Sequence, residues 1–295
     1  MEFLLQLVIN GLVTGSIYSL VALGFVVIFK STSVLNFAQG EFMLLGAYVC
    51  LTLAVQYQLP FAVAFLLTLV FSAVLGILTE RVVLRPMIGE PVISLIMVTL
   101  GLSAILKAVV QAIWSTDLRP FPNIFPTTPV QIGPLPVSQG YLYSTASVAV
   151  LLLIFSLFFK FTRAGIAMRA TAFSQQVALS MGISVQRIFA LSWSLAAVVS
   201  AIGGVLLAGV RGGLDGALAF FGLKVVPVVI LGGLDSIGGA ILGGLVMGVL
   251  ENLAGGYLDP LVGGGAKEVA PFIILVLILT VKPYGLFGKV KIERV

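Results

Sequence analysis

The feature that limits this chain most is a series of apolar runs that recurs from its first residues into its last third. Each run is roughly 20 residues long, the length at which a helix crosses the hydrocarbon core of a bilayer. Because the bilayer offers backbone groups no water to bond, such runs predict helices rather than a barrel of alternating strands. Hydrophobic residues make up 60% of the 295 positions and charged residues only 9%, which excludes a soluble globular domain. We therefore expect an all-α, polytopic membrane protein.

The runs predict about 8–10 transmembrane helices, some of them broken or half helices, in one transmembrane domain over residues 1–295. The expected spans cover about residues 3–29, 42–55, 61–83, 92–114, 141–159, 188–210, 215–233, 235–252 and 269–281. Between the first two lies the polar segment 30–42, with Asn36, Gln39 and Glu41. Non-helical backbone is tolerated at membrane depth where protein buries it or it lines a cavity. The segment is therefore either a broken helix beside a pathway or a plain cytoplasmic turn.

Basic residues predict the orientation of the chain. Ten fall in loops or tails that one arrangement places in the cytoplasm, namely Arg81, Arg85, Lys160, Arg163, Arg169, Arg187, Lys282, Lys289, Lys291 and Arg294. Only Arg119, Arg211 and Lys267 are then clearly outside, as the positive-inside rule requires. This places the N-terminus outside and makes residues 115–141, which are rich in proline, an extracytoplasmic loop with a short strand pair near 130–137.

A polar interruption covers residues 160–187 on the cytoplasmic side. Ala170, Phe173, Val177 and Met181 recur at spacings of three and four, which predicts the apolar face of one short surface helix ended by Gly182. Two alternatives follow. The helix either lies on the membrane surface and does nothing more, or seats its apolar face in a groove of a soluble partner and transmits that partner's movement.

Lys224 is the most informative charged residue, because a lysine inside a span needs a partner or access to water. Glu251 lies in the next run at a depth where the two side chains can meet. The pair, or Lys224 alone, either borders a pathway or is a structural ion pair. A lysine that snorkels to the outer surface is the other structural alternative.

Small residues in the following run predict close helix packing. Gly239 with Gly243, and Gly244 with Gly248, form two small-x-x-x-small faces.

Several function classes are excluded by what the sequence lacks. With no histidine, imidazole metal sites and Ser-His nucleophiles cannot form, and we expect no metal, no cofactor and no catalytic residues. A phosphate-binding G-x-x-x-x-G-K-[ST] loop is also absent, so nucleotide-driven work requires another chain. Cys50 is alone in an apolar run, which indicates a packed thiol. An autonomous channel or secondary transporter remains an alternative, although coupling-ion ligands near mid-membrane are sparse. The net charge of +5 reports orientation rather than nucleic-acid binding.

Three motifs resemble one family. VLNFAQGEFMLLGAYV, GGLDSIGGAILGGLVMGVLE and the terminal KPYGLFG closely resemble, in the same order, motifs of the LivH-type permeases of branched-chain amino acid ABC transporters, and the resemblance runs nearly end to end. RATAFSQQVALSMGI then resembles the coupling segment on which that family's ATPase subunit docks. The coupling residues that the resemblance implies are Arg169, Ala170, Phe173, Val177, Met181 and Gly182. Separately from the resemblance, the polar and charged residues discussed above are the candidates for a transport pathway: Asn36, Gln39, Glu41, Lys224 and Glu251.

The resemblance also implies which partner subunits the chain has. A second, related permease would pack against this chain through small-residue faces, two ATPase subunits would dock on the cytoplasmic side, and a soluble extracytoplasmic binding protein would deliver substrate. The assembly would lie in a bacterial or archaeal cytoplasmic (inner) membrane. The implied substrates are leucine, isoleucine and valine, with urea or short amides as the alternative. The permease itself would be no enzyme.

Overall fold

Six helices in the part of the chain described here are long and apolar enough to cross a membrane, which confirms the polytopic all-α prediction. The computed structural model describes residues 2–126, 128–132, 135–282 and 285–288, so the basic tail positions Lys289, Lys291 and Arg294 lie outside it. The six are α1 (Glu2–Thr32), α3 (Phe61–Thr79) with its continuation η2 (Glu80–Leu84) and η3 (Arg85–Met87), α4 (Val92–Trp114), α5 (Gln139–Phe161), α8 (Val185–Arg211) and α10 (Ile237–Tyr257).

Three further apolar helices are too short to span a bilayer on their own. They are α2 (Gln39–Leu51), which continues into the π-helical turn η1 (Thr52–Gln56), α9 (Phe220–Gly232), which follows the 3₁₀ turn η4 (Gly216–Ala219), and α12 (Ala266–Val281). The first turns of α2 and α9 touch at two glycines, because a Cβ on Gly40 would overlap the Ala219 carbonyl and one on Gly222 would overlap Gly40. The predicted half helices are thus packed against each other.

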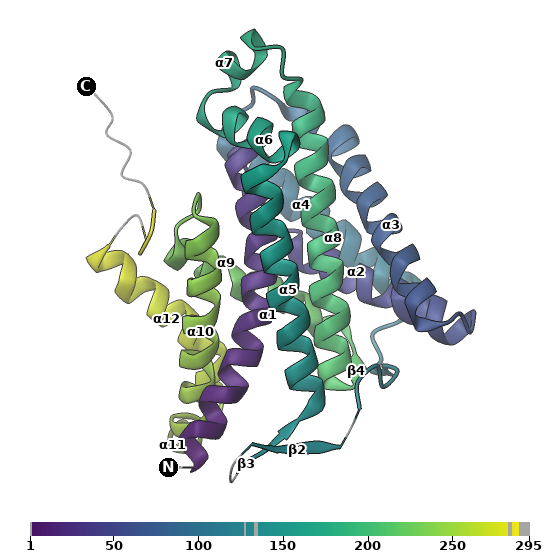
Figure 1. Ribbon diagram of the computed structural model, residues 1–295, viewed down its shortest axis with the longest axis vertical. Helices are drawn as coiled ribbons and strands as arrows, with labels where there is room; N and C mark the ends of the chain where they lie inside the picture. Colours follow the sequence, from purple (N-terminus) through teal and green to yellow (C-terminus); the bar gives the residue numbers. More distant parts are fainter. Residues whose placement is uncertain (1, 127, 133–134, 283–284, 289–295) are drawn as a thin grey trace.

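Two of the long helices form the core. The apolar windows of α1 and α8 are 83% and 72% buried, whereas those of α3, α4 and α5 are between 17% and 22% buried. Figure 1 shows α1, α5 and α8 running along the long axis, with α3 at one side and α10 and α12 at the other. The outer helices therefore turn apolar side chains outward, as helices in contact with lipid do.

A non-helical segment separates α1 from α2. Ser33 has φ 57°, and residues 33–38 are not helical. Asn36 and Ala38 are fully buried in this segment. Of the two alternatives for residues 30–42, the buried polar backbone fits a broken helix rather than a plain surface turn.

The two ends of the molecule differ. The short helices α6 (Arg163–Phe173) and α7 (Gln175–Ser180) lie at one end, and the hairpin of β2 (Pro129–Ile132) and β3 (Leu135–Ser138) lies at the other, beside the start of α1 (Figure 1). Val130 pairs with Val137, which confirms the predicted strand pair. A second antiparallel pair joins β1 (Arg119–Pro120) to β4 (Gly213–Leu214), and α11 (Asp259–Val262) precedes α12.

Candidate functional site

Local signals fix α6 across the end of the bundle. The Thr162 hydroxyl accepts a hydrogen bond from the Gly165 amide at 3.0 Å and so caps the first turn. Gly165 lies directly on α5, where a Cβ would come within 2.6 Å of the Phe159 Cα. Met168 and Thr171 are buried on the inner face. The helix is therefore docked on its own chain through one side, and its other side faces outward.

The prediction of one continuous helix through residues 170–181 is wrong. At Ser174 the backbone is extended, with φ −157° and ψ 117°, and the Ser174 hydroxyl accepts from the Val177 amide at 3.3 Å. A serine in this role starts a new helix, so the chain divides into α6 and α7. Ala178 on α7 is buried against Val185 and Phe189 of α8.

Three of the four residues predicted to form the apolar face of that helix belong to an exposed surface, together with Leu179. Phe173 is 92% exposed and Met181 is 77% exposed, and Val177 and Leu179 are also exposed. We call these four residues the α6–α7 surface. Ala170 is half-buried, and the exposed Arg169 donates a hydrogen bond to the Lys160 carbonyl at 3.3 Å. Gly182, with φ 79°, lies just past the last turn, where a left-handed residue ends a helix. Large apolar side chains open on this scale at the tip of a molecule indicate a surface that another protein or a membrane covers.

A buried ionic centre joins four helices, and we call Tyr18, Lys224, Glu251 and Glu268 the ionic centre. Lys224 Nζ lies 2.8 Å from Glu251 Oε1 and 2.6 Å from Glu268 Oε2. The Tyr18 hydroxyl donates to Glu251 Oε2 at 2.5 Å. The side chains of Lys224 and Glu251 are only 9% and 1% exposed, whereas that of Glu268 is 67% exposed. Lys224 is thus held between one buried carboxylate and one open carboxylate.

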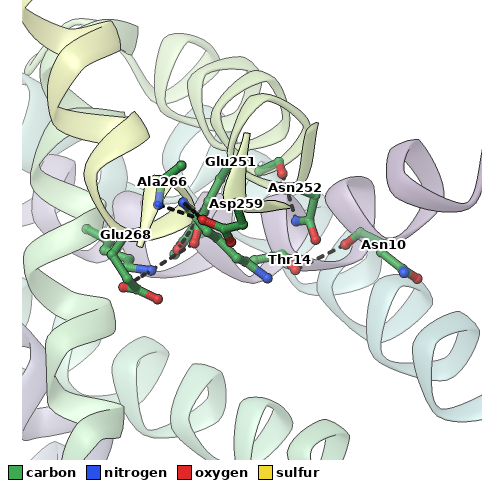
Figure 2. Close-up of polar contacts among 11 residues, drawn as sticks. Asn10, Thr14, Glu251, Asn252, Asp259, Ala266 and Glu268 are labelled. Carbon is green, nitrogen blue, oxygen red and sulfur yellow. Dashed lines mark hydrogen bonds and ion pairs between the residues drawn. The ribbon is translucent and has the colours of Figure 1, made fainter. Parts of the chain in front are cut away.

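Asp259 fixes the start of the helix that carries Glu268. Asp259 Oδ1 accepts from the Ala266 amide at 2.6 Å and from the Lys267 amide at 3.3 Å, and Figure 2 shows this loop beside Glu251 and Glu268. Three successive glycines, residues 263–265, have positive φ and allow the tight return. A carboxylate on the free amides of a first turn stabilises the helix, so α12 begins at a defined place.

An aromatic ring connects the ionic centre to a further cation. The Arg211 guanidinium carbon lies 4.4 Å from the centroid of the Phe221 ring, and Lys224 Nζ lies 5.6 Å from the same centroid. Tyr18 packs on that ring as well, with centroids 5.5 Å apart. Arg211 is exposed and forms no ion pair with any residue in the described ranges.

Asn36 and Gln39 form a separate buried network. Asn36 Nδ2 donates to Gln39 Oε1 at 3.0 Å, and Gln39 Nε2 donates to the Ser200 hydroxyl of α8 at 2.6 Å. The Asn36 side chain also accepts from the Ala38 amide at 3.0 Å. These bonds hold the break between α1 and α2 against α8. Glu41 is 7% exposed, with Ser103 and Lys107 of α4 as its polar neighbours.

The predicted pathway candidates are therefore not one group. Lys224 and Glu251 meet in the ionic centre, Asn36 and Gln39 share a second network, and Glu41 lies near Ser103 and Lys107 of α4. Sequence reasoning missed Tyr18, Arg211 and Glu268. A tyrosine in the middle of an apolar run was the available signal, because its hydroxyl needs a partner there. Glu268 was assigned to a loop, although it directly precedes an apolar run.

The four predicted packing glycines face two different neighbours within the chain. All four glycines belong to α10. Gly244 and Gly248 pack against α1, where a Cβ on Gly244 would overlap Ser19 and one on Gly248 would overlap Gly15. Gly239 and Gly243 pack against α9, where the nearest atoms are backbone atoms of Gly232 and Val228. Both faces are occupied by the chain's own helices, so the expectation that small-residue faces join two permeases does not fit these glycines. Among the described residues, no group of three or more Cys, Asp or Glu side chains is placed to hold a metal ion.

Comparisons with known proteins agree on one family. A family model described as the permease component of the branched-chain amino acid transport system matches residues 7–281. The high-affinity branched-chain amino acid transport permease LivH of Escherichia coli K12 is 29% identical, over 99% of this chain and 98% of that protein. BraD of Pseudomonas aeruginosa, which carries the same description, is 30% identical over the same shares. The probable LivH of Methanocaldococcus jannaschii is 29% identical over 96% and 92%.

One solved structure shares the fold. A chain of PsaBC from Streptococcus pneumoniae, in complex with Fab, superposes with a TM-score of 0.51 and 15% sequence identity. The match covers 96% of this chain and 93% of that one. At this identity the likeness concerns the arrangement of helices alone.

Proposed function

Because the chain belongs to the permease family of the branched-chain amino acid transport system, we propose that it is the membrane-spanning permease subunit of an ATP-driven importer for leucine, isoleucine and valine. The match to that family over residues 7–281 carries this proposal. The relatives named above are transport permeases for branched-chain amino acids, which supports this substrate class over urea or short amides. A permease performs no covalent chemistry, and ATP hydrolysis belongs to separate subunits.

The partners follow from the family. Two ATPase subunits act on the cytoplasmic side, and a soluble extracytoplasmic protein delivers the substrate. A second homologous permease completes the membrane part as a heterodimer. Since the glycine faces of α10 are filled by α1 and α9, the contact with the second permease uses other surfaces of this chain. The complex lies in the cytoplasmic (inner) membrane.

The α6–α7 surface is the docking site for an ATPase subunit. Four large apolar side chains are exposed on two short helices, and α6 is fixed to α5 by Gly165 and α7 to α8 by Ala178. Movement of a docked subunit therefore reaches two long helices directly, and α8 belongs to the core. Arg169 and Gly182 flank the surface, Arg169 as a cation at its edge and Gly182 as the stop that returns the chain to α8. ATP-driven closure of the ATPase pair then tilts the helices and switches access across the membrane.

The decisive test is uptake of radiolabelled leucine into proteoliposomes that hold this chain with the second permease, the ATPases and the binding protein. We expect uptake that requires ATP and the binding protein. Urea uptake without leucine uptake by an assembly that hydrolyses ATP would contradict the substrate class. Leucine uptake by this chain alone, without ATP, would contradict the importer mechanism.

The docking surface has its own variant. Phe173→Asp replaces the most exposed apolar side chain of the α6–α7 surface with a carboxylate. Because a charge at this position weakens apolar contacts, we expect the variant to reduce both co-purification of the ATPase and leucine uptake. Val130→Asp is the matched control, because it makes the same kind of change at an exposed position in the hairpin at the other end. Equal retention of the ATPase by both variants would show that docking occurs elsewhere.

A further inference from the structure

Two charged side chains at or beside the ionic centre are open rather than buried. Arg211 is exposed at the end of α8, and the Glu268 side chain is 67% exposed at the start of α12. Glu268 belongs to the ionic centre through its ion pair with Lys224, and Arg211 contacts the Phe221 ring that lies beside Lys224. The ionic centre includes Tyr18, halfway along α1, so it lies well inside the bundle. Because charged groups at this level are costly against lipid tails, these two side chains border water or protein.

The Glu251 carboxylate has a partner on each oxygen, whereas Glu268 and Arg211 keep polar groups open. Glu251 receives Lys224 on one oxygen and Tyr18 on the other. Glu268 uses Oε2 for Lys224. Arg211 rests on a ring face, and among the described residues no side chain or carbonyl accepts a hydrogen bond from it, so its N–H donors can take a planar anion. Within the described ranges, the outward groups are thus one guanidinium and one carboxylate beside a shared aromatic ring.

This pair of opposite charges matches a zwitterion. We propose that Arg211 and Glu268 form a binding site for the free amino acid at the extracytoplasmic end of the pathway. Arg211 takes the α-carboxylate and Glu268 takes the α-ammonium. Leu223, which precedes Lys224 on α9 and is 42% exposed, offers apolar surface to the side chain. The inference rests on the proposed transport function and adds the site and the contacts of its substrate.

Charge balance supports the assignment. Lys224 and Arg211 offset Glu251 and Glu268, so the group is neutral before a ligand arrives, and a zwitterion leaves it neutral. A net anion or cation would leave one charge of the ligand without a counter-charge in this neutral group, which makes it a poorer match than a zwitterion. Lys224 and Asp259 are positioning residues, because Lys224 holds the Glu268 carboxylate and Asp259 fixes the first turn of α12.

The first experiment uses the complete importer in proteoliposomes, as above. We expect Arg211→Gln and Glu268→Gln each to lower leucine uptake about tenfold or more, the loss typical of one charge-assisted contact. Stimulation of ATP hydrolysis by the leucine-loaded binding protein should stay within about twofold of the parent, since neither residue lies on the α6–α7 surface. Asp117→Asn is the control, because it removes an exposed carboxylate from the loop at the same end.

The outcomes separate the two proposals. Uptake at the parental rate in either variant, or a parallel fall of uptake and ATP hydrolysis, would overturn the site. Absence of leucine uptake by the parent complex would instead overturn the proposed function. Greater uptake with Arg211→Lys than with Arg211→Gln is expected, since lysine restores the charge without the planar fork.

A labelling experiment tests the site without transport. Cys50 is the only cysteine in the chain, so Cys50→Ser provides a cysteine-free background for Arg211→Cys, Glu268→Cys and the control Asp117→Cys. The whole complex is treated with a membrane-impermeant thiol reagent, and this chain is then separated and measured. Each test variant keeps half of the site. We expect isocaproate, which lacks the ammonium, to slow labelling of Glu268→Cys, and isoamylamine, which lacks the carboxylate, to slow labelling of Arg211→Cys. Protection no greater than in the Asp117→Cys control would overturn the site.

Discussion

At the scale of single residues, Lys224 determines how the ionic centre holds together. Its ammonium pairs with Glu251, which has no other cation within 4.0 Å among the described residues, and with the open Glu268. Removing one partner of a buried ion pair leaves the other charge uncompensated, and this is more destabilising than removing both. Lys224 is therefore the residue on which the junction of α1, α9, α10 and α12 depends.

We expect Lys224→Met to reduce the stability of the purified chain in detergent by about 3 kcal/mol or more, because it strands the Glu251 carboxylate. Lys224→Met combined with Glu251→Gln should recover a large part of that loss. Denaturant titration of the three proteins measures both effects. If the double variant is less stable than Lys224→Met alone, the buried pair is not the source of the loss.

Sequence reasoning reached Lys224 and Glu251 but not their neighbours. The two residues are unusual in apolar runs, and helix geometry places them at compatible depths. Tyr18 lies 233 positions before Glu251 in the sequence, and no local pattern predicts that the two side chains meet. Arg211 looked like an ordinary external charge. Its role depends on the Phe221 ring of α9, which lies under its guanidinium and which no local pattern around Arg211 indicates.

At the scale of elements, helix packing rests on glycines whose neighbours are backbone atoms. A Cβ on Gly248 would overlap Gly15 of α1, whereas one on Gly238, in the first turn of the same helix, would meet nothing within 4 Å. Backbone atoms cannot rotate away as a side chain can, so α1 and α10 would have to separate.

We expect Gly248→Ala to destabilise the chain by about 1–3 kcal/mol, the usual effect of overpacking, and Gly238→Ala to be neutral or slightly stabilising. The same denaturant titration compares them. Two variants of equal stability would mean that α1 and α10 can separate without loss.

Elements were easier to predict than the joints between them. Apolar runs gave the long helices to within a few residues, because length and hydropathy alone decide a span. The break at Ser174 was missed, since the spacing of Phe173, Val177 and Met181 fits one helix as well as two. The extended backbone and the hydroxyl cap at Ser174 decided between them.

At the scale of the whole molecule, the α6–α7 surface and the β2–β3 hairpin lie at opposite ends (Figure 1). The distribution of basic residues predicts that the first faces the cytoplasm and the second faces outward.

In the Cys50→Ser background, we expect Val130→Cys to react with a membrane-impermeant thiol reagent added outside intact cells. In cells that produce this chain without the ATPase, which would otherwise cover Met181, Met181→Cys should react only after the membrane is opened, because both positions are exposed but on opposite sides. The reverse pattern of labelling would show that the chain has the opposite orientation, and it would contradict the cytoplasmic docking site.

The antiparallel contact of α1 with α10 also has a consequence for synthesis. Ser19 donates to the Ile241 carbonyl, 222 positions later, and Tyr18 reaches Glu251 later still. Ribosomes add about 5–20 residues per second, so α1 waits on the order of tens of seconds for its partner to leave the ribosome. During that interval its glycine face and both hydroxyls are open to the insertion machinery or to lipid. Early termination anywhere before α10 therefore leaves an inserted first helix without its partner, a form that membrane quality control can distinguish from the finished permease.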